Sequence, residues 1–130
     1  MEKTSVLVLI AEDEAEIRNV LQITFEEGGF DVVLVPTGEQ ALEALDSQGE
    51  ELRAVVTDIM LGGAVSGWDV ARHARERRAD MPVVYMTGSE GKDWPSLGVP
   101  NSILITKPFA PSQILTAVSQ LLNAGPPPAD

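Results

Sequence analysis

Apolar runs and amphipathic segments alternate along the whole chain. The run Val6–Ala11 is continuous and rich in β-branched residues, as expected of a strand buried on both faces. Further short apolar runs, bounded by turn residues, predict four more strands. These runs lie at 31–35, 54–57, 82–86 and 102–105.

The segments between these runs have helical spacing. The first carries apolar residues at i, i+3, i+4 and i+8 from Ile17, with Thr24 at i+7, and it ends at Gly28. The second opens with the capping-box spacing of Thr37 and Gln40. Two more helices are predicted from about Ser66 to Arg78 and from Pro111 onward. Residues 88–101 are rich in Gly, Pro and Ser, so any helix there is expected to be short or irregular.

Strands that alternate with helices predict an α/β fold, a doubly wound five-stranded parallel sheet with about five helices. We expect the flavodoxin-like strand order 2-1-3-4-5, with any ligand beyond the carboxyl ends of the strands. We expect one domain over residues 1–124. The proline-rich residues 125–130 are expected to form a flexible tail.

The charge of the chain narrows its function. Nine basic and 20 acidic residues give a net charge of −11, and residues 1–58 hold 14 of the acids. Direct binding to nucleic acid needs a basic surface, so it is not expected. The chain has no cysteine and one histidine, which excludes disulfides and multi-histidine metal sites. No apolar run is long enough to cross a membrane, and we expect a soluble cytoplasmic protein.

Polar residues follow the ends of four predicted strands. Glu12 and Asp13 follow the first, Asp58 the third, Thr87 the fourth and Lys107 the fifth. Three carboxylates close together repel one another unless a cation lies between them. Oxygen ligands without His or Cys favour Mg²⁺ or Mn²⁺. A divalent cation, a lysine and a hydroxyl group are suited to binding a phosphoryl group, and a carboxylate can accept one covalently.

Four short motifs at these strand ends resemble the receiver domain of two-component response regulators, including the single-domain, chemotaxis-type regulators. They are Ala11–Glu14, Thr57–Met60, Met86–Gly88 and Thr106–Phe109. The resemblance covers about residues 5–123. One such motif would be weak, whereas four in order at predicted strand ends are specific.

The resemblance implies a magnesium site and a phosphoacceptor. Asp58 matches the phosphoacceptor, and it would also be a metal ligand. Asp13 matches the direct ligand of the ion, and Glu12 would bind the ion through water. The backbone carbonyl of Met60 would complete the set. The loop after Asp58 lacks the proline usual in the family and is about a residue longer.

The resemblance also implies a switch. Lys107 would pair with a phosphoryl oxygen, and Thr87 would move to donate a hydrogen bond to it. The family usually has an aromatic residue three positions before this lysine, where the chain has Leu104. Tyr85 is a candidate substitute, although an ordinary strand residue is the preferred interpretation.

These features predict a phosphorelay protein that is not an enzyme beyond its own phosphorylation and dephosphorylation. The donor would be a phosphohistidine of a sensor histidine kinase or a phosphotransfer protein. The kinase is expected to dock near the first helix and the loop 107–109. We expect signalling through a downstream protein target, with no nucleic acid or membrane contact. Two alternatives stay open: a pseudo-receiver that binds partners without phosphorylation, and a receiver domain excised from a hybrid histidine kinase.

Overall fold

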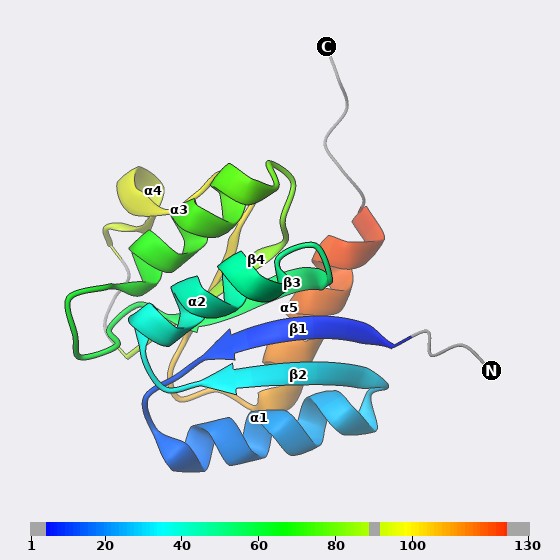
Figure 1. Ribbon diagram of the computed structural model, residues 1–130. Coiled ribbons are helices and arrows are strands. Elements are labelled where there is room, and N and C mark those ends of the chain that lie inside the picture. The colour runs from blue at the N-terminus through cyan, green and yellow to red at the C-terminus, as the bar shows by residue number, and fades with distance from the viewer. Residues whose placement is uncertain (1–4, 89–91, 125–130) are drawn as a thin grey trace.

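The computed structural model describes residues 5–88 and 92–124, so the proline-rich tail expected at 125–130 lies outside the described residues. Five parallel strands form one sheet in the order β2-β1-β3-β4-β5 (Figure 1). This order and the alternation with helices confirm the predicted fold class. The strands are β1 (Val6–Ala11), β2 (Phe30–Val35), β3 (Leu52–Asp58), β4 (Val83–Thr87) and β5 (Ile103–Thr106).

Helices connect the strands, and two of them begin at a residue whose side chain caps the first turn. Thr37 Oγ1 accepts the backbone N–H of Gln40, and Ser66 and Asp69 form a reciprocal capping box. Gly29, just beyond the first helix, has a φ of +92°, which glycine adopts without strain. The helices are α1 (Ala15–Glu27), α2 (Gly38–Gln48), α3 (Gly67–Arg77), α4 (Trp94–Leu97) and α5 (Pro111–Ala124).

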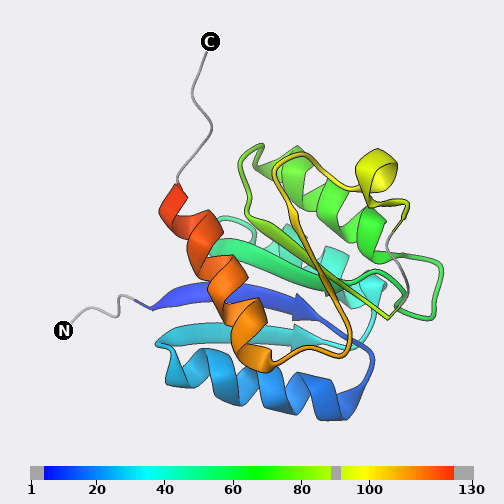
Figure 2. The ribbon, with the colours of Figure 1, turned by 180° about the vertical axis from the view of Figure 1, so that it is seen from behind.

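The helices cover the sheet in two layers. Helices α1 and α5 pack on one face through residues such as Leu21, Phe25 and Ile114 (Figure 2). Helices α2 and α3 pack on the other through residues such as Leu45 and Val70. The central strands β1 and β3 are therefore buried on both sides, which explains their unbroken apolar sequences.

The register of the strands brings their carboxyl ends to one edge. Ala11 pairs with Thr57, Asp58 with Met86, and Thr87 with Thr106. The last two strands end one residue later than the apolar runs alone predicted, because Thr87 and Thr106 pair with each other. Residues 12, 13, 58, 87 and 107 therefore lie at or just beyond one edge of the sheet.

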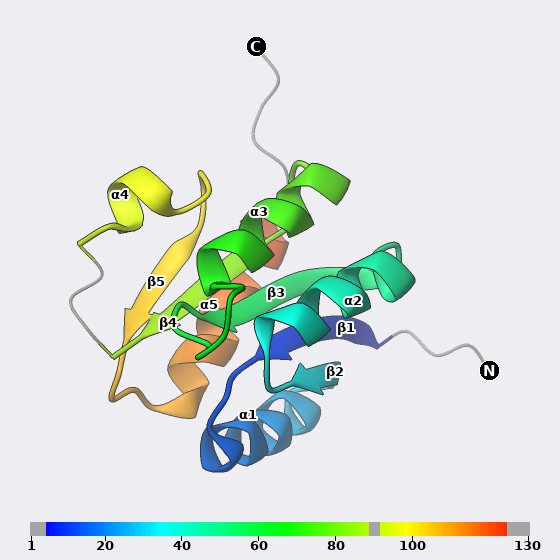
Figure 3. The same cartoon turned by 60° about the vertical axis from the view of Figure 1, so that its left-hand side comes forward.

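The segment after β4 contains little helix, as its composition predicts. Helix α4 is a single turn of four residues, and no side chain caps its first turn. Figure 3 shows α4 beside β5 and α3, at the end of the sheet opposite β2. Within the described parts of the chain, no helix has the length and apolar character needed to cross a membrane.

Candidate functional site

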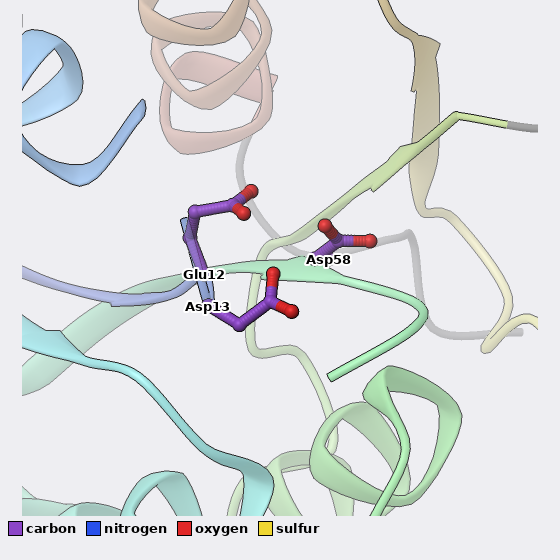
Figure 4. Close-up of side chains that lie close together, drawn as sticks. All are labelled: Glu12, Asp13 and Asp58. Atoms are coloured by element: carbon purple, nitrogen blue, oxygen red, sulfur yellow. The ribbon is translucent and has the colours of Figure 1, made fainter. Parts of the chain in front are cut away.

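Three carboxylates meet at the carboxyl edge of the sheet. Glu12 and Asp13 follow β1, and Asp58 is the last residue of β3 (Figure 4). One oxygen of each lies within 4.8 Å of an oxygen of the others. Glu12 and Asp58 are buried, whereas Asp13 is exposed. The structure therefore brings together the three acids that the sequence placed in one site.

Asp58 is held in a fixed orientation. Its Oδ1 accepts the backbone N–H of Met60 at 3.1 Å, and its Oδ2 accepts from Lys107 Nζ at 2.8 Å. The Asp58 backbone carbonyl accepts the hydroxyl of Thr57 at 2.8 Å. Asp58 is only 5% exposed, so its carboxylate is largely shielded from solvent.

Glu12 is fully buried, and its two oxygens differ. Oε2 accepts the backbone N–H of Glu14 at 3.0 Å. Oε1 lies 3.2 Å from Lys107 Nζ, but it accepts no well-aligned hydrogen bond and is the one such buried side-chain atom in the described part of the chain. Burial, assisted by the negative charge of Asp58, raises the pKa of Glu12 to about 7, against the lowering effect of Glu14 and Lys107.

Lys107 is the cation of the site. Burial favours its neutral form, but the hydrogen bond and charge of Asp58, with a contribution from Glu12, raise its pKa above the usual value. Its backbone N–H donates to the carbonyl of Thr87 at 2.7 Å, and a cis peptide bond joins it to Pro108. Thr87 itself is 2% exposed. The predicted lysine and hydroxyl residue thus lie beside each other at this edge.

The loop between β3 and α3 begins directly after Asp58, beside the cluster. Met60, whose carbonyl the sequence analysis offered as a metal ligand, is 72% exposed at the start of this loop. The last part of this loop lies close to its first residues, because the N–H of Gly67 donates to the carbonyl of Ile59 at 2.9 Å. A Cβ on residue 67 would lie 2.1 Å from the Asp58 carbonyl oxygen, so glycine is required there.

The candidate ligands fit a hard divalent cation. All the side-chain ligand atoms are carboxylate oxygens, which Mg²⁺ and Mn²⁺ prefer. The unsatisfied Oε1 of Glu12 is a buried acceptor beside these donors, and an ion or an ion-bound water is a suitable partner for it. The cluster Glu12, Asp13 and Asp58 is therefore typical of a magnesium site.

Some contacts of the site have no counterpart in the sequence analysis. Arg18, one turn into α1, donates to the backbone carbonyl of Glu12 at 2.7 Å. Gly38, the first residue of α2, approaches Val65 so closely that a Cβ would lie 2.4 Å from the Val65 carbonyl oxygen. Gly38 and Val65 lie in segments that only the folded chain brings together, and nothing in the spacing of Arg18 and Glu12 indicates their hydrogen bond.

A doubly wound parallel sheet with polar residues at the carboxyl ends of its strands places the chain in the class of α/β domains that bind ligands at that edge. Comparison with known proteins identifies the family. Residues 8–119 match the family model of the response regulator receiver domain. The chain belongs to this family, whose members interact with histidine kinases or phosphotransfer proteins.

Several relatives support this assignment. The chain is 30% identical over 117 residues to response regulator SaeR of Staphylococcus epidermidis, covering 88% of this chain and 49% of SaeR. It is 28% identical over 118 residues to the alkaline phosphatase synthesis transcriptional regulatory protein PhoP of Bacillus subtilis, covering 89% and 48%. The chain therefore spans about half the length of these curated relatives.

Solved structures agree on the fold. A response regulator receiver protein from Sinorhizobium medicae WSM419 is 45% identical, with a TM-score of 0.90, and the match covers 95% of this chain and 98% of that one. The receiver-like fold thus extends over nearly the whole chain.

Proposed function

We propose that this domain accepts a phosphoryl group on Asp58 from a phosphohistidine, in a reaction that depends on Mg²⁺. The observation that carries the proposal is the state of Asp58. It is a buried carboxylate fixed by Lys107 and the N–H of Met60, inside a cluster that contains an unsatisfied acceptor on Glu12. A carboxylate so oriented is suited to nucleophilic attack on phosphorus.

In the proposed step, one carboxylate oxygen of Asp58 forms a bond to phosphorus. The bond between phosphorus and the histidine nitrogen breaks, and its electron pair stays on the ring nitrogen, which takes a proton from water. Lys107 offsets negative charge on the phosphoryl oxygens, because its ammonium group already lies 2.8 Å from Asp58. The hydroxyl of Thr87 is the proposed donor to the transferred group.

Asp13, Asp58 and the carbonyl of Met60 are the proposed ligands of the cation, and Glu12 would hold it through water. The bound Mg²⁺ would neutralise charge that develops on the transferred phosphoryl group. The same cation lets three neighbouring carboxylates remain ionised together. Mn²⁺ would serve in its place, since it accepts the same ligands.

The proposed docking site for the donor protein is a groove beside the cluster. Residues of α1 and of the loop before α5, among them Ile17, Lys107 and Phe109, line an apolar space of about 520 Å³. Val20 also lines this groove and is 45% exposed, and Ile23, 57% exposed, adds apolar surface on α1. A helix from a kinase or phosphotransfer protein could bury this surface and bring its phosphohistidine to Asp58.

We also propose that the phosphorylated domain signals by contact with another protein rather than with nucleic acid. The net charge of −11 supports this proposal, since phosphate backbones repel an acidic surface.

Intact-mass measurement with a small-molecule phosphodonor tests the chemistry. With Mg²⁺ the protein should gain the mass of one phosphoryl group, and the gain should disappear in chelator and in Asp58→Asn. The matched control is Asp46→Asn, an exposed acid whose partners are His73 and Arg77 on α3. No mass gain from the phosphodonor or from any histidine kinase of the source organism would refute the proposal and favour a non-phosphorylated binding module.

Phosphotransfer from a phosphorylated kinase tests the docking site. Val20→Glu places a charge in the groove, so transfer from the kinase should slow while reaction with the small phosphodonor is unchanged. Leu97→Glu is the matched control, because Leu97 is similarly exposed, at 41%, but lies on α4. Equal kinase transfer to wild type and Val20→Glu would place the docking site elsewhere.

A further inference from the structure

Tyr85 is the single tyrosine of the chain and is fully buried in β4, two residues before Thr87. Its hydroxyl accepts the backbone N–H of Val99 at 3.0 Å. Burial raises the pKa of this phenol, so it stays protonated at neutral pH. A buried strand residue is thus bonded directly to the segment between α4 and β5.

That segment is joined to Tyr85 by a chain of hydrogen bonds. Trp94 Nε1, at the start of α4, donates to Ser102 Oγ at 2.9 Å, and Ser102 Oγ donates to the carbonyl of Val99 at 2.7 Å. Val99 is 8% exposed and closes the chain through its N–H to Tyr85. Residues 94–102 are therefore attached to the core at the Tyr85 hydroxyl.

Tyr85 is also connected to the phosphoacceptor. Its ring packs on Trp68, with centroids 4.9 Å apart. Trp68 follows Gly67, whose N–H is bonded to the carbonyl of Ile59, the residue after Asp58. Displacement of the loop after Asp58 would therefore move the indole that packs on Tyr85.

The register partner of Tyr85 on the neighbouring strand has no hydroxyl group. Leu104 is the register partner of Tyr85 on β5 and packs into the same core layer. An aliphatic side chain can fill this space but cannot donate or accept a hydrogen bond. The hydroxyl of Tyr85 therefore supplies a polar link to residues 94–102 that Leu104 cannot supply.

We propose that Tyr85 couples the state of Asp58 to residues 94–102, a role that rests on the proposed function. When Asp58 is unphosphorylated, the Tyr85 hydroxyl accepts the hydrogen bond from the N–H of Val99. Phosphorylation displaces Thr87 and the loop beneath Trp68, which weakens this hydrogen bond and releases the segment. The two states of the switch differ in whether the Tyr85–Val99 bond is made.

The single tyrosine permits a test in the wild-type protein. Tyrosine labelled with carbon-13 at Cζ gives one resonance, which reports the hydrogen bonding of its hydroxyl. Phosphodonor and Mg²⁺ should produce a second resonance, in proportion to the phosphorylated fraction measured by intact mass. A full mass gain with an unshifted tyrosine resonance would overturn this proposal alone, whereas no mass gain would overturn the proposed function and this coupling with it.

Amide exchange in Tyr85→Phe provides the second test. Loss of the hydroxyl should speed exchange at Val99 roughly tenfold before phosphorylation, as expected for one lost hydrogen bond. Phosphorylation should then change that exchange little, while the extent of phosphorylation stays at the wild-type level. Ser47→Ala is the control, because it removes a hydroxyl bonded within α2. Wild-type exchange at Val99 in Tyr85→Phe, both before and after phosphorylation, would refute the coupling.

Discussion

Replacement of Glu12 by Gln should change how stability depends on pH. Glu12 is fully buried, and its pKa in the folded protein is raised from 4.5 to about 7. The folded state therefore binds more protons than the unfolded state between these values, so the stabilisation present at low pH is lost as the pH rises through about 7. Gln is neutral throughout and similar in shape, so it removes this dependence.

The size of the effect follows from the shift in pKa. At about 1.4 kcal/mol per pKa unit, the shift reduces the unfolding free energy of the wild type by about 2 to 3 kcal/mol between about pH 5 and about pH 8. Lys107 keeps its charge across this range, because its pKa is raised above 10.5. In chelator, the unfolding free energy of Glu12→Gln should therefore be closer to that of the wild type at the lower pH and exceed it at the higher pH.

Urea denaturation at the two pH values, with chelator and then with saturating Mg²⁺, measures the effect. The difference between wild type and Glu12→Gln cancels the contributions of the other titrating groups. Mg²⁺ should reduce or reverse this difference in unfolding free energy at the higher pH. The ionised Glu12 of the wild type favours Mg²⁺ binding at the proposed site, and binding stabilises the folded state. Parallel pH profiles for the two proteins in chelator would refute the assignment of a raised pKa to Glu12.

Three further substitutions test how the site is held. Gly38→Ala should lower the unfolding free energy by about 1–3 kcal/mol and weaken Mg²⁺ binding, because its methyl would lie 2.4 Å from the Val65 carbonyl oxygen. Urea denaturation and Mg²⁺ titration measure the two effects, with Gly63→Ala as the control. Lys107→Met should lower the unfolding free energy by about 2–4 kcal/mol at pH 8 and by less near pH 5, where protonation of Glu12 removes the negative charge that Lys107 offsets. Equal losses of unfolding free energy at the two pH values would contradict this reasoning. Ser66→Ala should cost about 1 kcal/mol through loss of the α3 cap, and an unchanged melting temperature would exclude a contribution from that cap.

The sequence predicted the strands well because their apolar runs face two helical layers. It also predicted which polar residues meet, since parallel strands end at one edge and four motifs occupy those ends. Boundaries were less exact where pairing decides them, as at Thr87 and Thr106. Local sequence records burial, but it does not record which residue of a strand is the last to pair.

The contacts that tune the site could not be predicted. The sequence analysis offered Glu12 as an indirect metal ligand, whereas the structure also shows it fully buried beside Lys107, 95 positions further along the chain. The bond from Val99 to the Tyr85 hydroxyl likewise joins residues that only the turn of α4 brings together. Burial of a charged group and the partner of a buried hydroxyl are properties of tertiary packing, so spacing along the chain does not reveal them.

The charge balance of the site explains why one lysine is central. Glu12 and Asp58 are both buried beside Lys107, which contacts both at 3.2 and 2.8 Å. Burial, with the negative charge of Asp58 added, raises the pKa of Glu12 even though Lys107 lies beside it. A phosphoryl group on Asp58 would add negative charge and draw Lys107 further toward it. Because the backbone N–H of Lys107 is bonded to the carbonyl of Thr87, such a movement would act on the end of β4, and from there on Tyr85.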